Sequence, residues 1–146
     1  EYIAEEAGHE EWVLDDLEAC GIARDAAQHS APAAATELMV AYAYDTVQRV
    51  NPLGFFGMVH VLEGTSVALA SAAAAGIQGA LELPDAAFSY LRSHGALDQA
   101  HVGLFAGLMD RITAPAEQAA IVHAARMFYR LYGNVFRSLD GVTACN

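Results

Sequence analysis

Three polar residues in the second half of the chain have the spacing of metal ligands on one face of a helix. They are His94, Asp98 and His101, at positions i, i+4 and i+7. At about 100° per residue, the side chains of Asp98 and His101 project within about 40° of the direction of His94, and the three residues span about 10 Å of helix axis. Two imidazoles with a carboxylate between them suit one metal ion or a close pair of ions. The alternative is a solvated polar stripe, although Leu97 and Phe105 occupy neighbouring positions.

A second pairing of ligand types lies near the N-terminal end of the sequence. Glu6 and His9 stand at i and i+3, the Glu-x-x-His spacing through which one helix of a di-iron carboxylate bundle holds an iron. Glu5, Glu10 and Glu11 surround them, and an acidic helix face is most often solvated. The pairing is therefore weak evidence when it is taken alone.

Glu63 is an isolated acid in a long apolar segment. Within residues 50–81 the only other ionisable residue is His60. A buried carboxylate that lacks a partner costs several kcal/mol or becomes protonated, so Glu63 needs a partner. A divalent metal ion shared with other carboxylates is one such partner, and Arg126 or Arg130 is the alternative.

Together these positions supply three imidazoles and three carboxylates from three separate helices. Such a set suits two iron ions, or two manganese ions, bridged by carboxylate. A structural zinc site is not expected, because Cys20 and Cys145 have no metal-binding or redox spacing. The predicted metal ligands are Glu6, His9, Glu63, His94, Asp98 and His101.

The elements that must position these ligands are all helices. Apolar residues recur at helical spacing, and no segment shows strand alternation. Gly21 is placed to end the first helix, and Asn51 followed by Pro52 is placed to open the third. We expect one all-α domain over residues 1–146, a bundle of about five helices. Their predicted ranges are 1–20, 36–50, 51–75, 84–108 and 116–139, with a loop between the first two.

The third predicted helix is long enough and apolar enough to raise the question of a membrane span. Glu63 would then lie near the bilayer centre, which is unfavourable, and no basic flank marks a cytoplasmic side. A helix that is apolar on nearly all sides is otherwise the buried central helix of a bundle. We therefore expect no membrane span.

The composition limits the class of protein. Apolar residues make up 55% of the 146 residues and charged residues 17%, which excludes a disordered chain. A net charge of −11 argues against nucleic acid and anionic membranes as partners. No secretory apolar segment opens the sequence, which predicts a cytoplasmic protein. Because Glu1 already reads as helix interior, we expect that an N-terminal stretch is missing.

Three motifs resemble those of the haem-oxygenase-like di-iron oxidases and oxygenases. They are Glu6-Ala-Gly-His9-Glu-Glu-Trp12, Val61-Leu62-Glu63-Gly64 and His94-x3-Asp98-x2-His101. This superfamily shares its helical fold with haem oxygenase, the thiaminase-like proteins and the pyrroloquinoline quinone synthase group. The resemblance implies a seven-helix fold, of which about two N-terminal helices would be missing. It also implies that the six predicted ligands bind iron, with Glu5 as the alternative to Glu6.

The activity implied by the resemblance is that of a non-haem di-iron enzyme. Two iron ions would activate O2 to oxidise a small organic substrate of the fatty-acid, amino-acid or amine type. We expect Tyr42, Phe55, Phe56 and Met58 to line an apolar pocket beside the metals, and a homodimer is compatible with this interpretation. The alternatives are a metal-free enzyme of the thiaminase-like or quinone-synthase-like kind and a ferritin-like iron-binding bundle.

Overall fold

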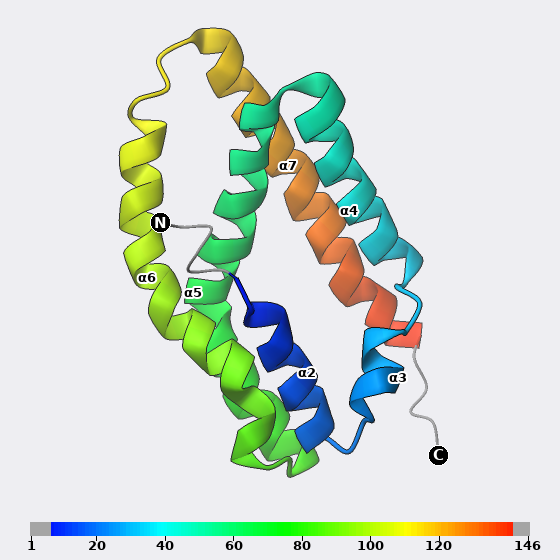
Figure 1. Ribbon diagram of the computed structural model, residues 1–146. Coiled ribbons are helices and arrows are strands. Elements are labelled where there is room, and N and C mark those ends of the chain that lie inside the picture. Colours follow the sequence, from blue (N-terminus) through cyan, green and yellow to red (C-terminus); the bar gives the residue numbers. More distant parts are fainter. Residues whose placement is uncertain (1–6, 142–146) are drawn as a thin grey trace. The chain divides into compact units, whose positions relative to one another are not determined.

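The computed structural model describes residues 7–141 and, within them, the side chains of residues 7–94 and 103–139. This part of the chain is helical apart from short connections and contains no strand, so the all-α prediction is confirmed there (Figure 1). The α-helices are α2 (His9–Ala19), α3 (Arg24–Gln28), α4 (Ala34–Asp45), α5 (Phe55–Leu81), α6 (Ser89–Met109) and α7 (Pro115–Arg137). A π-helix covers Thr46–Val50, and 3-10 turns cover Pro52–Gly54, Asp85–Phe88 and Ser138–Gly141.

The chain divides into two compact units. The first contains Glu1–Ser30 and Thr65–His101, and the second contains Ala31–Gly64 and Val102–Asn146. The long helices α5 and α6 each contribute residues to both units, so each unit is built from segments that lie far apart in the sequence. The prediction of a single domain stays a prediction.

The second unit packs around a small apolar cluster. Val61, Ala124 and Phe128 are its buried residues, and Met58 is among the partly buried side chains against them. α4 and α7 lie side by side within this unit (Figure 1). Gly57 brings α5 directly onto α7, because a Cβ atom there would lie only 2.5 Å from the Ala125 nitrogen. Only glycine permits this approach of two helix backbones.

The first unit has its own cluster, in which Ala74, Ala87 and Phe88 are buried. A side chain of α2 holds the start of α6. The Asp16 carboxylate accepts hydrogen bonds from the amides of Ser89 and Tyr90, both at 2.9 Å. These amides have no partner within their own helix, so Asp16 caps α6 from a distant part of the sequence.

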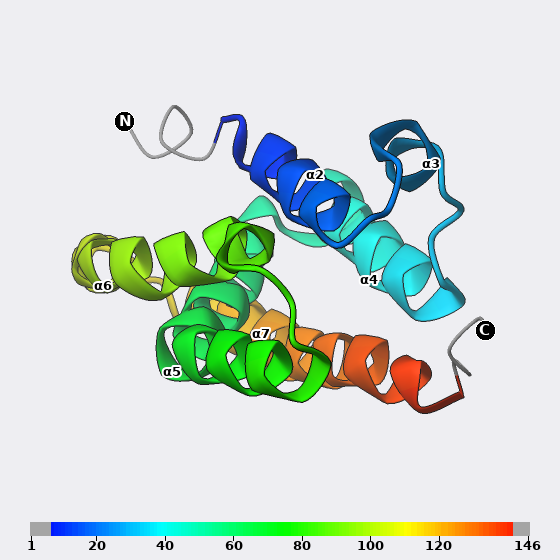
Figure 2. The same ribbon diagram turned by 90° about the horizontal axis from the view of Figure 1, so that it is seen from below.

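Two predicted helix boundaries are confirmed. Gly21 has φ 86° and ends α2; its amide donates to the Glu18 carbonyl at 2.9 Å, and the Ile22 amide donates to the Leu17 carbonyl at 3.0 Å. This pair of bonds is the Schellman motif, and Figure 2 shows the turn that leads from it into α3. At the second boundary, the Asn51 side chain accepts from the Leu53 amide at 3.0 Å.

Other predicted boundaries are wrong. The expected loop before residue 36 contains α3, and α4 begins at Ala34. α5 continues to Leu81 rather than ending near residue 75. Gly76 lies inside this helix, because the surrounding alanines favour helix strongly enough to tolerate one glycine.

The predicted burial of the long apolar helix is confirmed for only part of its surface. Val61, Ala70 and Ala74 are buried, but Leu69 is 57% exposed and Ile77 is 42% exposed. Among the described residues, the helical stretch Pro52–Leu81 has the length and composition of a membrane-crossing segment, and 28% of its most apolar window is buried.

Candidate metal centre

His94 has the geometry of a metal-binding imidazole. It lies on α6 and is only 8% exposed. Its Nδ1 atom is 2.9 Å from the backbone oxygen of Tyr90, and a carbonyl can only accept a hydrogen bond, so Nδ1 carries the proton. In the neutral imidazole the lone pair is then on Nε2, which is the atom that can bind a metal ion. A carbonyl behind the imidazole is a common means of orienting a histidine ligand.

His9 lies close to His94, although 85 positions separate them in the sequence. It is the first residue of α2, directly after Gly8 with φ 95°. The centroids of the two imidazole rings are 4.8 Å apart, and the rings are nearly perpendicular at 81°. Both residues belong to the first unit. The structure therefore brings together one predicted ligand from each of the two His-containing motifs.

Two aromatic side chains flank these imidazoles. The Trp12 ring stacks on His9 with centroids 4.2 Å apart, and the Tyr90 ring lies 4.0 Å from that of His94. Rings at these distances restrict the orientation of the two imidazoles and keep water from one side of each. The sequence analysis did not assign Trp12 or Tyr90 to the site. Their spacing was a usable signal, because i+3 and i−4 neighbours share a helix face with the histidine.

Glu63 lies on α5 in the second unit. Glu63 as a whole is half-buried, and its Oε1 atom is buried. Arg126 and Arg130, the alternative partners considered for it, are both exposed on α7. The observed partial burial agrees with the expectation that this acid is not a simple surface residue.

The other three predicted ligands lie outside the described side chains. Glu6 precedes the described residues, and Asp98 and His101 fall in the stretch 95–102 of α6. The backbone of α6 is helical across that stretch, as the spacing argument requires. Among the described residues, no group of three or more His, Cys, Asp or Glu side chains gathers as a metal site. The six-ligand set stays a prediction.

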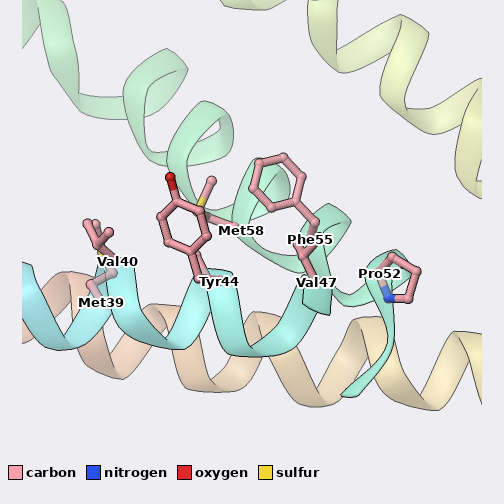
Figure 3. Close-up of a pocket in the computed structure, with 8 residues that line it drawn as sticks. Met39, Val40, Tyr44, Val47, Pro52, Phe55 and Met58 are labelled. Carbon is pink, nitrogen blue, oxygen red and sulfur yellow. The ribbon is translucent and has the colours of Figure 1, made fainter. Parts of the chain in front are cut away.

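An apolar cavity lies within the second unit, between α4 and the beginning of α5 (Figure 3). Its volume is about 560 Å³. Phe55 and Met58 line it, as predicted. The prediction was wrong for Tyr42, whose ring packs 5.0 Å from that of Phe128, and for Phe56, whose ring lies 6.2 Å from that of Phe105. The lining residues are Met39, Val40, Ala43, Tyr44, Val47, Pro52, Phe55 and Met58.

The described donors fit an iron centre. Neutral imidazole nitrogen and carboxylate oxygen are ligands that iron and manganese accept, and His94 presents a lone pair of the required kind. The one described free cysteine, Cys20, packs beside the apolar cluster of the first unit rather than beside the histidines.

A comparison with known protein families shows the class of protein to which the chain belongs. The family model described as iron-containing redox enzyme matches residues 1–133. The chain belongs to this family. The match covers both histidines and Glu63, and it confirms the resemblance drawn from the three motifs. It makes the protein an iron-containing redox enzyme with an all-α fold. Neither the curated proteins nor the solved structures contain a match to it.

Proposed function

We propose that this iron-containing redox enzyme is a non-haem di-iron oxidase or oxygenase, which uses O2 to oxidise a small organic substrate of the fatty-acid, amino-acid or amine type. The observation that carries the proposal is the pairing of His9 and His94, in which the Tyr90 carbonyl beside Nδ1 of His94 leaves Nε2 as the nitrogen that can bind a metal ion. In a family that contains iron, the pairing is best explained as half of a metal centre.

Under this proposal, six residues hold two iron ions, and manganese is the alternative metal. The ligands are Glu6, His9, Glu63, His94, Asp98 and His101. When bound, the ferrous ions supply the electrons that activate O2.

The chain's own residues have three tasks around this centre. The imidazoles provide neutral nitrogen ligands, and the Tyr90 carbonyl fixes the tautomer of His94. The carboxylates balance the charge of the ions, and Glu63 is the acid that the apolar helix α5 would contribute. Trp12 and Tyr90 shield the imidazoles from water, which strengthens each interaction with the ions.

Anaerobic titration with ferrous iron tests the proposal, and Trp12 is its probe. Trp12 is the only tryptophan of the chain, and its ring lies 4.2 Å from His9 and 6.0 Å from His94. Iron bound by these imidazoles should therefore quench the intrinsic fluorescence, with saturation near two equivalents. Admission of O2 should then produce an optical absorption change.

The matched variants are His94→Ala and His123→Ala, since His123 is an exposed histidine on α7. We expect His94→Ala to weaken iron binding at least ~100-fold, because it removes a direct ligand, and His123→Ala to titrate like the wild type. Unquenched wild-type fluorescence, or equal quenching in His94→Ala, would contradict the proposal and favour a metal-free enzyme.

A further inference from the structure

The cavity of the second unit lies on a different side of α5 from Glu63. At about 100° per residue, Phe55 and Met58 project roughly 60° apart, whereas Glu63 is rotated roughly 80° from Phe55 and 140° from Met58. Gly57 presses α5 onto the α7 backbone, and Phe55 and Met58 extend beside that contact toward α4 (Figure 3). The cavity is thus a separate feature from the predicted ligand face of the helix.

No charged side chain is among the described residues that line the cavity. Tyr44 contributes the one polar side-chain group, its hydroxyl, among eight lining residues. Two charged residues close to the lining in the sequence form an ion pair with each other. Two guanidinium nitrogens of Arg49 donate to the Asp45 carboxylate at 2.6 and 2.8 Å. The chain contains no lysine, and its net charge is −11. A carboxylate or phosphate in this cavity would lose its hydration without gaining a cation.

The size and the walls of the cavity suit a small molecule. About 560 Å³ lies within the range of ligand pockets. Met39 and Met58 are unbranched side chains that adjust to the shape of an apolar guest. Val47 belongs to a π-helix, in which the Asn51 amide donates to the Thr46 carbonyl at 2.9 Å. Single π-helical turns occur frequently at functional sites.

The lining side chains also leave apolar surface in contact with water. Val40 is 46% exposed, Tyr44 63% and Phe55 39%. Such surface is removed from water when an apolar molecule binds, which provides the driving force for binding. Figure 3 shows Tyr44 and Phe55 extending in the same direction from the two helices, with Met58 between them.

We infer that this cavity binds an uncharged, apolar small molecule. The assignment of that molecule as the substrate of the enzyme rests on the proposed function, whereas its binding does not. The inference concerns the part of a substrate that lies in the cavity: an uncharged apolar portion fits there, whereas a free carboxylate would have to lie outside the lining.

Two dyes with the same ring system test the inference on metal-free protein. N-phenyl-1-naphthylamine is neutral, and 8-anilino-1-naphthalenesulfonate adds one sulfonate to the same skeleton. Fluorescence titration should give a dissociation constant at least ~10-fold lower for the neutral dye, because the cavity offers the sulfonate no cation. 1-Decanol should displace the neutral dye at concentrations where decanoate does not.

Substitutions locate the binding. Val47→Asp and Val40→Asp each place a charge in the lining, and each should weaken binding of the neutral dye ~10-fold or more. Val122→Asp is the matched control, because Val122 is a 51% exposed valine on α7 outside the lining. Circular dichroism shows whether each variant is folded, and two lining variants keep the test valid if one is not.

Equal affinity for the two dyes, displacement by decanoate as effective as by decanol, or unchanged binding in a folded lining variant would overturn the inference. Because no iron is present, these results are independent of the metal titration. A chain that binds the neutral dye but not iron would overturn the proposed function alone.

Discussion

At the scale of single residues, the two described histidines of the predicted ligand set are oriented by different means. His94 is fixed by a hydrogen bond to the Tyr90 carbonyl, and His9 is stacked on Trp12. The spacing of ligand types in the sequence was sufficient to select both histidines. It did not select Trp12 or Tyr90, although each shares a helix face with its histidine, because an aromatic residue at i+3 or i−4 is equally typical of ordinary core packing.

Trp12→Leu tests the role of the stack. Leucine keeps an apolar side chain but removes the flat ring beside His9, so the imidazole loses an orienting contact. We expect the affinity for Mn²⁺, measured by isothermal titration calorimetry, to fall by about 10-fold. Phe136→Leu, which changes a 54% exposed aromatic residue on α7, is the control. Equal affinities in the two variants would assign Trp12 no part in positioning His9.

At the scale of elements, the sequence predicted the long helices well and their surroundings less well. Helical spacing and the signals at Gly21 and Asn51 gave the correct order of elements. The short helix α3 was missed because it is held by tertiary ion pairs, in which Arg24 binds Asp15 at 2.5 Å and also Glu11. The π-helix Thr46–Val50 was missed because apolar spacing does not distinguish i−5 from i−4 bonding.

The contact between α5 and α7 gives a matched pair of glycine substitutions. Gly57→Ala places a Cβ atom 2.5 Å from the Ala125 nitrogen, and we expect it to lower the free energy of unfolding by about 1–3 kcal/mol. Gly76 lies in the same helix with nothing within 4 Å of such an atom. Gly76→Ala should therefore raise the free energy of unfolding by about 0.5–1 kcal/mol.

Urea denaturation of the two glycine variants measures both effects. If Gly57→Ala were as stable as the wild type, the close approach of the two helix backbones would be wrong. If Gly76→Ala were destabilised, α5 would not continue through residue 76 as a regular helix.

The connection between α5 and α6 gives a pH-dependent contribution to stability. Gln78 donates to Asp85 at 2.8 Å, and Arg92 lies 3.2 Å from the same carboxylate. These contacts, that of Gln78 first, lower the pKa of Asp85 below its ordinary value of 3.8. A lowered folded-state pKa means that the stabilisation is present above the unfolded-state pKa and is lost as the pH falls through the folded-state pKa.

Asp85→Asn should therefore be slightly less stable than the wild type at about pH 7, and the difference should disappear as the pH falls through the lowered pKa of Asp85. Thermal unfolding across this pH range measures it. Arg92→Gln should remove part of the same contribution, so the double variant should be less destabilised than the sum of the single variants. A stability difference that persisted at low pH would contradict the assigned ion pairing.

At the scale of the whole molecule, family membership and the pairing of His9 with His94 agree on an iron-containing redox enzyme. The ligand set stays a prediction from the sequence, which rests on the donors that metal ions require at particular helical spacings. The sequence predicted an apolar pocket but only part of its lining, because the lining comes from α4, the π-helix and α5 together. Of the four residues predicted to line it, Tyr42 packs against Phe128 in the apolar cluster of the second unit and Phe56 packs against Phe105.

The most direct measurement is anomalous diffraction at the iron absorption edge, from crystals grown with ferrous iron in the absence of O2. We expect two anomalous peaks in each chain. One should lie about 2.0–2.3 Å from Nε2 of His94, and a carboxylate oxygen of Glu63 should be within coordination distance of at least one peak. A map without these peaks, or with iron bound away from both His94 and Glu63, would contradict the account.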